Sequence, residues 1–234
     1  MYGVNDVFDY ESDILNPRKG GIEGMREERA FHPFILRASM IIPIPFVIYL
    51  FIVGNLVADI TLIGLLFFVI AYSFKGVRFK EKPVLDSITS SLHFVGPLIY
   101  AFTLTTFNAS VWPYLIAFFF WGMASHAFGA VQDIIPDRSA NLSSIATVFG
   151  ARSTVWLCLS LYAGASILMF LQPGLARIVG VVGLLYSANI FFSVGITDET
   201  SASTHRAWRR FMWLNLVAGF VVTIVLLIST ITPF

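Results

Sequence analysis

The sequence predicts an all-α, polytopic transmembrane helical bundle. The chain has 234 residues, of which 57% are hydrophobic and only 12% are charged, against about 25% charged residues in an average soluble domain. The mean hydropathy is +0.79, so most of the chain must be buried in protein or in lipid. Long apolar stretches, and an uneven distribution of charge between their two ends, indicate that this environment is a membrane.

Seven stretches are apolar and close to the roughly 20 residues that a helix needs to cross about 30 Å of hydrocarbon. They run from Phe34 to Val57, Ile60 to Phe74, Leu92 to Phe107, Val111 to Val131, Thr154 to Leu171, Gly174 to Val194 and Phe211 to Thr230. The second and third are short for a span. A helical bundle is expected because helices satisfy their own backbone hydrogen bonds in lipid.

The charged residues predict the orientation of these spans. Of the 15 Lys and Arg residues, only Arg177 lies away from the N-terminal segment and the alternate connections that follow it. The positive-inside rule places those connections in the cytoplasm, as in an integral protein of the plasma membrane. Of the 14 acidic residues, only Asp59 lies outside that face. Because acids contribute little to topology, their gathering there needs a further reason.

Composition also excludes several classes of protein. A formal net charge of +1 gives no basic surface for nucleic acid, so no nucleic-acid partner is expected. A single cysteine, Cys158, excludes an internal disulfide framework and a cysteine-based metal site. The opening MYGVNDVFDYESD lacks the basic start and apolar stretch of a signal peptide.

The first acidic cluster lies at the start of the chain, in NDVFDYESD. In a helix, Asp6, Asp9 and Asp13 fall within about 60° on one face, where like charges repel. A divalent cation relieves this repulsion, and oxygen ligands with room for water suit Mg²⁺. We expect these three carboxylates, supported by Asn5, to hold one Mg²⁺.

The second acidic cluster, DIIPD, follows the fourth span on the same predicted membrane face. Asp133 and Asp137 are spaced i, i+4, and Pro136 is expected to kink or end the helix there and to direct both carboxylates into a cavity. The two clusters suggest a weak internal repeat, with two half-bundles around one site. We expect Asp133 and Asp137 to hold a second Mg²⁺.

A basic loop, YSFKGVRFKEKP, lies between the two clusters and is also predicted to be cytoplasmic. Arg78 and Lys80, with Tyr72 and with Arg138 of the second cluster, are the groups expected to hold a diphosphate. Each feature has a simpler interpretation. An acidic run is commonly a solvated face, and positive-inside charge explains a basic loop without chemistry. Their occurrence together on one face favours a metal–diphosphate site.

These motifs resemble those of the UbiA-type intramembrane prenyltransferases. NDVFDYESDxxNPRKGG resembles the family's first motif NDxxDxxxD, and DIIPD resembles its second, DxxxD. YSFKGVRFK is similar to the family's YS...RxK loop, and SIATVFGAR to the segment after the second motif. SHAFGAVQDIIPDRSANLSSIATVFGAR and WRRFMWLN are most similar to the lycopene elongase branch.

The resemblance implies a catalytic role for Asp6, Asp9, Asp13, Asp133 and Asp137. The implied reaction transfers an allylic prenyl group from a prenyl diphosphate to a lipophilic acceptor, here dimethylallyl to lycopene entering from the membrane lipid. It also implies a nine-helix bundle in which the first acidic motif lies at the end of the second helix. By that comparison, residues 1–234 form a single UbiA-like domain without the first helix and most of the second. Either a late start codon or a true truncation would explain this.

Three other functions agree with parts of the pattern. A prenyltransferase for an aromatic or quinone-precursor acceptor would share the metal site, and product analysis would separate the two. A cation-coupled transporter would also use carboxylates, but near the membrane midplane. A non-catalytic remnant that binds a partner enzyme is the third.

Overall fold

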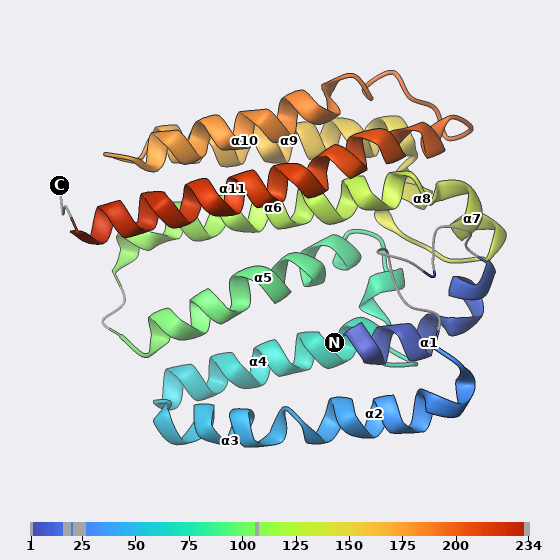
Figure 1. Cartoon of the computed structure of the whole chain (residues 1–234), viewed down its shortest axis with the longest axis horizontal. Helices are drawn as coiled ribbons and strands as arrows, with labels where there is room; N and C mark the ends of the chain where they lie inside the picture. Colours follow the sequence, from blue (N-terminus) through green and yellow to red (C-terminus); the bar gives the residue numbers. More distant parts are fainter. Residues whose placement is uncertain (1, 16–19, 21–26, 106–107, 232–234) are drawn as a thin grey trace. The chain divides into compact units, whose positions relative to one another are not determined.

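The computed structural model describes residues 2–15, 20, 27–105 and 108–231, and within this part of the chain helices are joined by turns without any strand (Figure 1). Two compact units are present. One comprises Met1–Lys80 with Gly96–Phe107, and the other comprises Glu81–Val95 with Asn108–Phe234. The all-α fold class predicted from the sequence is confirmed.

The first unit contains an N-terminal helix and two membrane-length helical segments. Its helices are α1 (Tyr2–Leu15), α2 (His32–Ile41), α3 (Ile44–Val53) and α4 (Leu56–Ser73), with the short 3-10 turn η1 (Arg29–Phe31). A second 3-10 turn, η2 (Phe79–Glu81), begins in this unit and ends at Glu81, the first residue of the other unit. Within this unit, α1 contacts α2 and α4, and α3 contacts α4. These contacts place the N-terminal acidic helix beside the last turns of α4, where the basic loop begins.

The second unit is built around α9, which packs between α6 and α10, while α10 packs on α11 (Figure 1). Its elements are η3 (Ala109–Val111), α6 (Trp112–Val131), α7 (Ile134–Ser139), α8 (Ile145–Phe149), α9 (Ala151–Phe170), α10 (Ala176–Phe191), η4 (Ser201–Thr204) and α11 (His205–Ile231). Small residues permit close packing: a Cβ on Gly183 would lie 2.3 Å from Ser166 Oγ. Tyr162, Phe128 and Ile134 are among its fully buried side chains.

Helix α5 (Leu85–Thr103) is shared by both units, and the boundary falls between Val95 and Gly96, next to Pro97. Proline removes one backbone donor within the helix at that point. Asp86, near the start of α5, is fully buried in the second unit. It accepts hydrogen bonds from the Ser87 amide at 2.6 Å and the Ile145 amide at 2.7 Å. This carboxylate therefore ties the start of α5 to the start of α8.

Each of the seven predicted spans coincides with helix in the described residues. Five helical segments are long and apolar enough to cross a membrane: Arg29–Val53, Leu56–Ser73, Ala109–Val131, Ala151–Phe170 and Ser201–Ile231. Two further apolar helices are not among the five. Helix α10 has 16 residues and is shorter than these segments, and the first turns of α5 are polar. The protein is therefore an integral membrane protein.

The boundary between the first two spans differs from the prediction. The first segment ends at Val53, not Val57, and α4 begins at Leu56, not Ile60. Asn55 determines this break, because its Oδ1 accepts from the amides of Val57 and Ala58 at 3.0 Å each and caps α4. The predicted third span ended at Phe107, and residues 106–107 lie outside the described part of the chain.

Candidate functional site

The first acidic motif lies on helix α1, as the helical spacing of its carboxylates requires. Asp6 and Asp9 are partly buried and Asp13 is 7% exposed. Residues 16–19 and 21, which close the motif in the sequence, lie outside the described residues. A helix that keeps three acids on one partly buried face needs compensating positive charge.

Lys80 supplies positive charge directly to this helix. Its Nζ donates to Asn5 Oδ1 at 2.8 Å and forms an ion pair with Asp9 Oδ1. The Lys80 side chain is 10% exposed and that of Asp9 is 16% exposed, so both charges are largely withdrawn from water. Two oxygens of the motif therefore converge on a single cationic nitrogen.

Arg78 supplies a second cation to the same carboxylate. Its Nη2 lies 3.2 Å from Asp9 Oδ1. The turn after α4 sets this position, because the Phe74 carbonyl accepts from both the Val77 and the Arg78 amides, at 3.1 and 3.0 Å. Arg78 has φ +40°, a left-handed conformation that a side chain bearing Cβ adopts at some energetic cost. The strained residue is thus one that pairs with the motif.

The end of α4 also contacts the motif. Ser73 Oγ donates to Asn5 Oδ1 at 3.1 Å, and Tyr72 precedes it on the last turn of α4. Within the first unit, the structure therefore gathers Asn5, Asp9, Arg78 and Lys80 into one cluster.

The second acidic motif spans a break between two helices. The sequence predicted a kink or an end at Pro136, but α6 already ends at Val131 and α7 begins at Ile134. Pro136 is the third residue of α7. The first N–H groups of a helix have no acceptor within that helix, so the missing N–H of proline costs α7 no hydrogen bond. Its ring would clash with the carbonyl four residues earlier, at Gln132, so the α6 helix cannot continue through that residue.

The break places Asp133 just before α7 and Asp137 inside it. The Asp137 amide donates to the Asp133 carbonyl at 2.9 Å, which is the i, i+4 relation that the spacing predicted. Both side chains are partly exposed. Carboxylates one helical turn apart lie on the same side of a helix.

Arg138 is turned toward protein groups of the second unit. Its Nε and Nη2 donate to the Thr147 carbonyl at 3.1 and 2.6 Å, and its Nη1 lies 2.7 Å from Asp198 Oδ2. These contacts use three of the five guanidinium N–H groups and leave two for another acceptor.

Asp198 and Asp86 organise the second unit and were not predicted from the sequence. The amide of Ala151 donates to Asp198 Oδ1 at 2.7 Å, and this bond, together with Arg138, lowers the pKa of the Asp198 carboxyl. The place of Asp86 in the first turn of α5, where negative charge favours the helix N-terminus, was a sequence signal for that residue. No local signal marks Asp198, because its partners lie 47 and 60 residues away in the sequence.

The donor chemistry of both motifs suits a hard divalent cation. Asp and Asn oxygens are the ligands that Mg²⁺ prefers, and Asn5 and Asp9 already converge on the Lys80 ammonium. Among the described residues, no group of three or more His, Cys, Asp or Glu side chains is arranged to hold a metal alone.

Comparisons with known proteins agree with these motifs. The chain is 48% identical over 234 residues to the C(50) beta-cyclic carotenoids biosynthesis protein LbtBC of Dietzia sp. (strain CQ4), an alignment covering 99% of this chain and 54% of that protein. The chain thus spans about half the length of that relative. It is 47% identical over 229 residues to a lycopene elongase/hydratase of Corynebacterium glutamicum, covering 97% of this chain and 80% of the relative.

More distant relatives carry the same name. A lycopene elongase/hydratase of Haloferax volcanii is 30% identical over 224 residues, with 96% of this chain and 70% of the relative covered. No solved structure matches the chain significantly. The family model described as the UbiA prenyltransferase family matches residues 1–217. Because this model covers most of the chain, and relatives align along nearly all of it, the chain belongs to the UbiA prenyltransferase family.

Proposed function

We propose that this chain transfers a dimethylallyl group from dimethylallyl diphosphate to lycopene, as a carotenoid prenyltransferase. The observation that carries the proposal is the cluster of Asn5 and Asp9 with Lys80 and Arg78, which combines metal-ligand oxygens with phosphate-binding cations. The names of the relatives at 47% and 48% identity support lycopene as the acceptor. One family model extending over residues 1–217 supports treating both units as one prenyltransferase domain.

We propose Mg²⁺ as the metal. Prenyltransferases of the UbiA family generally use metal ions. Asp6, Asp9 and Asp13, with Asn5, are the proposed ligands from the first motif, and the second motif contributes Asp133 and Asp137. When bound, Mg²⁺ neutralises charge on the diphosphate and stabilises it as a leaving group.

The cations of the basic loop are proposed to exchange partners when the donor binds. In the structure, Lys80 and Arg78 neutralise Asp9. A diphosphate offers both groups more negative charge, and Arg binds phosphate with paired N–H groups. Tyr72 is proposed to assist from the end of α4. The two remaining guanidinium N–H groups of Arg138 are proposed to contact the same anion.

The reaction breaks the allylic C–O bond, and the electron pair leaves with the diphosphate. Cations held where this charge develops stabilise the transition state more than the ground state. The acceptor double bond then attacks the allylic carbon, and the new cation is quenched by loss of a proton or by addition of water. Apolar helices keep water from the allylic cation before the acceptor attacks.

We propose that the motifs face the cytoplasm from the plasma membrane, because all but one of the basic residues lie on that side of the predicted topology. Cysteine accessibility would test this. An introduced Glu28→Cys should react with an impermeant thiol reagent only after the cells are opened. Reaction in intact cells would place this face outside.

The experiment that tests the function offers the full chain, in lipid nanodiscs, one donor and two acceptors. Dimethylallyl diphosphate and Mg²⁺ are supplied with lycopene or with a phenolic quinone precursor, and products are identified by mass spectrometry. We expect lycopene to gain dimethylallyl units and diphosphate to be released. Prenylation of the phenol alone would show that the acceptor is the quinone precursor and not lycopene. Ion flux in vesicles without any prenylated product would favour a transporter.

A further inference from the structure

The second acidic motif lies on a helix that is too short to be stable by itself. Helix α7 has six residues, or about 9 Å, and isolated helices of this length do not persist in water. The direction of Asp133 and Asp137 therefore depends on what holds the two ends of α7. Both anchors come from one segment, residues 192–205, which comprises the connection after α10 and the first residue of α11 and is called the α10–α11 connection below.

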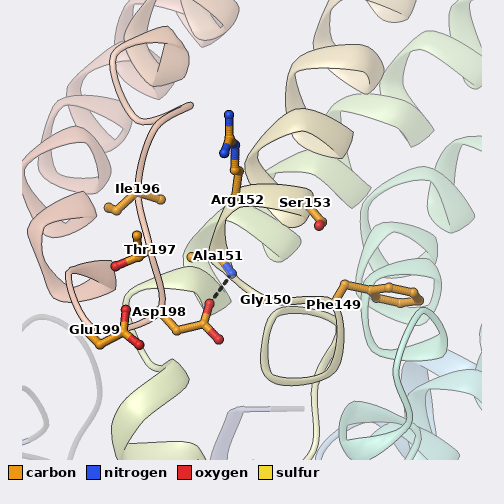
Figure 2. A pocket seen from close by; sticks show the side chains of 9 residues that line it. All are labelled: Phe149, Gly150, Ala151, Arg152, Ser153, Ile196, Thr197, Asp198 and Glu199. Atoms are coloured by element: carbon orange, nitrogen blue, oxygen red, sulfur yellow. Dashed lines mark hydrogen bonds between the residues drawn. The ribbon is translucent and has the colours of Figure 1, made fainter.

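The first anchor is Asp198, and it acts after the motif. Its Oδ1 accepts from the Ala151 amide at the start of α9, and its Oδ2 pairs with Arg138, the residue that follows Asp137. Figure 2 shows the Asp198 carboxylate directed at the first turn of α9, beside Gly150. Gly150 has φ +80°, and a Cβ there would lie 3.1 Å from Asp198 Oδ1.

Arg138 extends this anchor to the next helix. Its double contact with the Thr147 carbonyl fixes the guanidinium plane. Thr147 in turn belongs to the capping box at the start of α8, with its amide 3.2 Å from Ser144 Oγ. The end of α7 is therefore joined to α8, to the start of α9 and to the α10–α11 connection through one arginine.

The second anchor is His205, and it acts before the motif. Its Nδ1 lies 2.8 Å from Oε1 of Gln132, which immediately precedes Asp133. Gln132 is buried and donates to the Gly129 carbonyl at 3.1 Å. Trp208, one turn along α11, packs so closely on α6 that a Cβ on Gly129 would lie 2.9 Å from its ring.

We propose that the α10–α11 connection is a positioning device for the second acidic motif, with Asp198 holding its far end through Arg138 and His205 holding its near end through Gln132. These are positioning residues, since they act through neighbours of Asp133 and Asp137. What the positioned carboxylates do rests on the proposed function. The device itself follows from contacts on both sides of α7.

The test uses the full chain in nanodiscs and compares Asp198→Asn with Glu199→Gln. Asparagine keeps an oxygen for the Ala151 amide but removes the charge that pairs with Arg138. Glu199 is the adjacent exposed acid and serves as the matched control. Hydrogen–deuterium exchange is measured without metal, followed by Mn²⁺ binding by electron paramagnetic resonance. His205→Phe and its conservative partner His205→Asn are measured in the same way.

We expect Asp198→Asn to raise amide exchange in residues 133–149 and to leave α9–α11 unchanged. It should weaken Mn²⁺ binding about 10- to 100-fold, the effect typical of losing a residue that orients a metal ligand. His205→Phe should raise exchange at the α6–α7 break, and His205→Asn should restore part of the protection. If Asp198→Asn fails to fold, Arg138→Gln breaks the same ion pair from the other side.

Two results would overturn the proposal. Equal exchange in residues 133–149 of Asp198→Asn and Glu199→Gln would show that the Arg138–Asp198 pair does not hold α7. A rise in exchange throughout the second unit would show a general loss of stability. Because exchange is read without substrate, a chain that makes no prenylated product still tests the device. Failure of the proposed function and failure of the positioning are thus distinguishable.

Discussion

The two acidic motifs are held in different ways. On α1, Asp9 is neutralised by cations from the loop after α4, and Lys80 contacts Asn5 and Asp9 together. In the second motif, the adjacent cation, Arg138, is instead directed to Asp198 and to the Thr147 carbonyl. Charge is thus compensated at the first motif and used for anchoring at the second.

The lengths of the two helices explain this difference. Helix α1 has 14 residues and packs on two neighbours, so its carboxylates are positioned by their own helix. Helix α7 has six residues and needs anchors at both ends. The comparison supports the proposal that the cations at the first motif exchange partners when the donor binds, whereas the cation at the second motif is engaged in structural contacts.

The largest effect is expected from removing a carboxylate of either motif. Asp6→Ala and Asp133→Ala should each abolish turnover while the protein stays in the membrane, because a lost metal ligand leaves the leaving group unstabilised. Product formation is measured by mass spectrometry, with Glu28→Gln as an exposed acidic control. Near-normal turnover of either variant would remove that carboxylate from the mechanism.

Lys80→Gln should have the next largest effect, and it should act only on the first motif. Breaking a buried ion pair typically costs about 3–5 kcal/mol when the remaining charge is uncompensated, and because Arg78 still pairs with Asp9 we expect a cost below that range. We expect a lower thermal unfolding midpoint and at least a tenfold higher KM for dimethylallyl diphosphate. Lys75→Gln, an exposed lysine of the same loop, is the control. Equal behaviour of the two variants would contradict a special role for Lys80.

Gly150→Ala should have a moderate effect, confined to the second motif. Gly150 has φ +80° and ψ 163°, a conformation that is essentially restricted to glycine and costs another residue about 1–3 kcal/mol, and the new Cβ would meet Asp198 Oδ1 at 3.1 Å. The thermal midpoint should fall and metal binding should weaken. Gly219→Ala is the matched control because no atom lies within 4 Å of its added Cβ. A Gly150→Ala variant as stable as Gly219→Ala would argue against a close fit at Asp198.

The smallest effect concerns pH. The pKa of Asp198 is lowered in the folded protein, first by the Ala151 amide and then by Arg138. Its ionised form therefore contributes stability above the unfolded pKa of about 4. That contribution disappears as the pH falls through the lower folded value. Protection of the Ala151 amide, corrected for intrinsic exchange, should persist at pH 4.5 and decline only in stronger acid. In Asp198→Asn it should not change with pH over this range.

The sequence predicted the helical character of the chain well, because hydropathy over 20 residues and an i, i+3, i+7 acidic spacing are local signals. The break between the first two spans was predicted after Val57, whereas the structure has it at Asn55. A helix cap depends on one side chain and not on average hydropathy. The α6 break preceded Pro136 because a proline ring excludes the carbonyl four residues before it. The Arg138–Asp198 pair was not predicted, because only the folded α10–α11 connection brings those residues together.

The most direct test of the account is a Mg²⁺ titration of lycopene prenylation by the wild type, Asp9→Asn and Asp137→Asn in nanodiscs. We predict no product in the presence of a chelator and recovery when Mg²⁺ is restored. Both variants should require higher Mg²⁺ concentrations than the wild type, because each motif serves the same reaction. A full rate in the chelator, or a titration of Asp137→Asn that matches the wild type, would contradict the account.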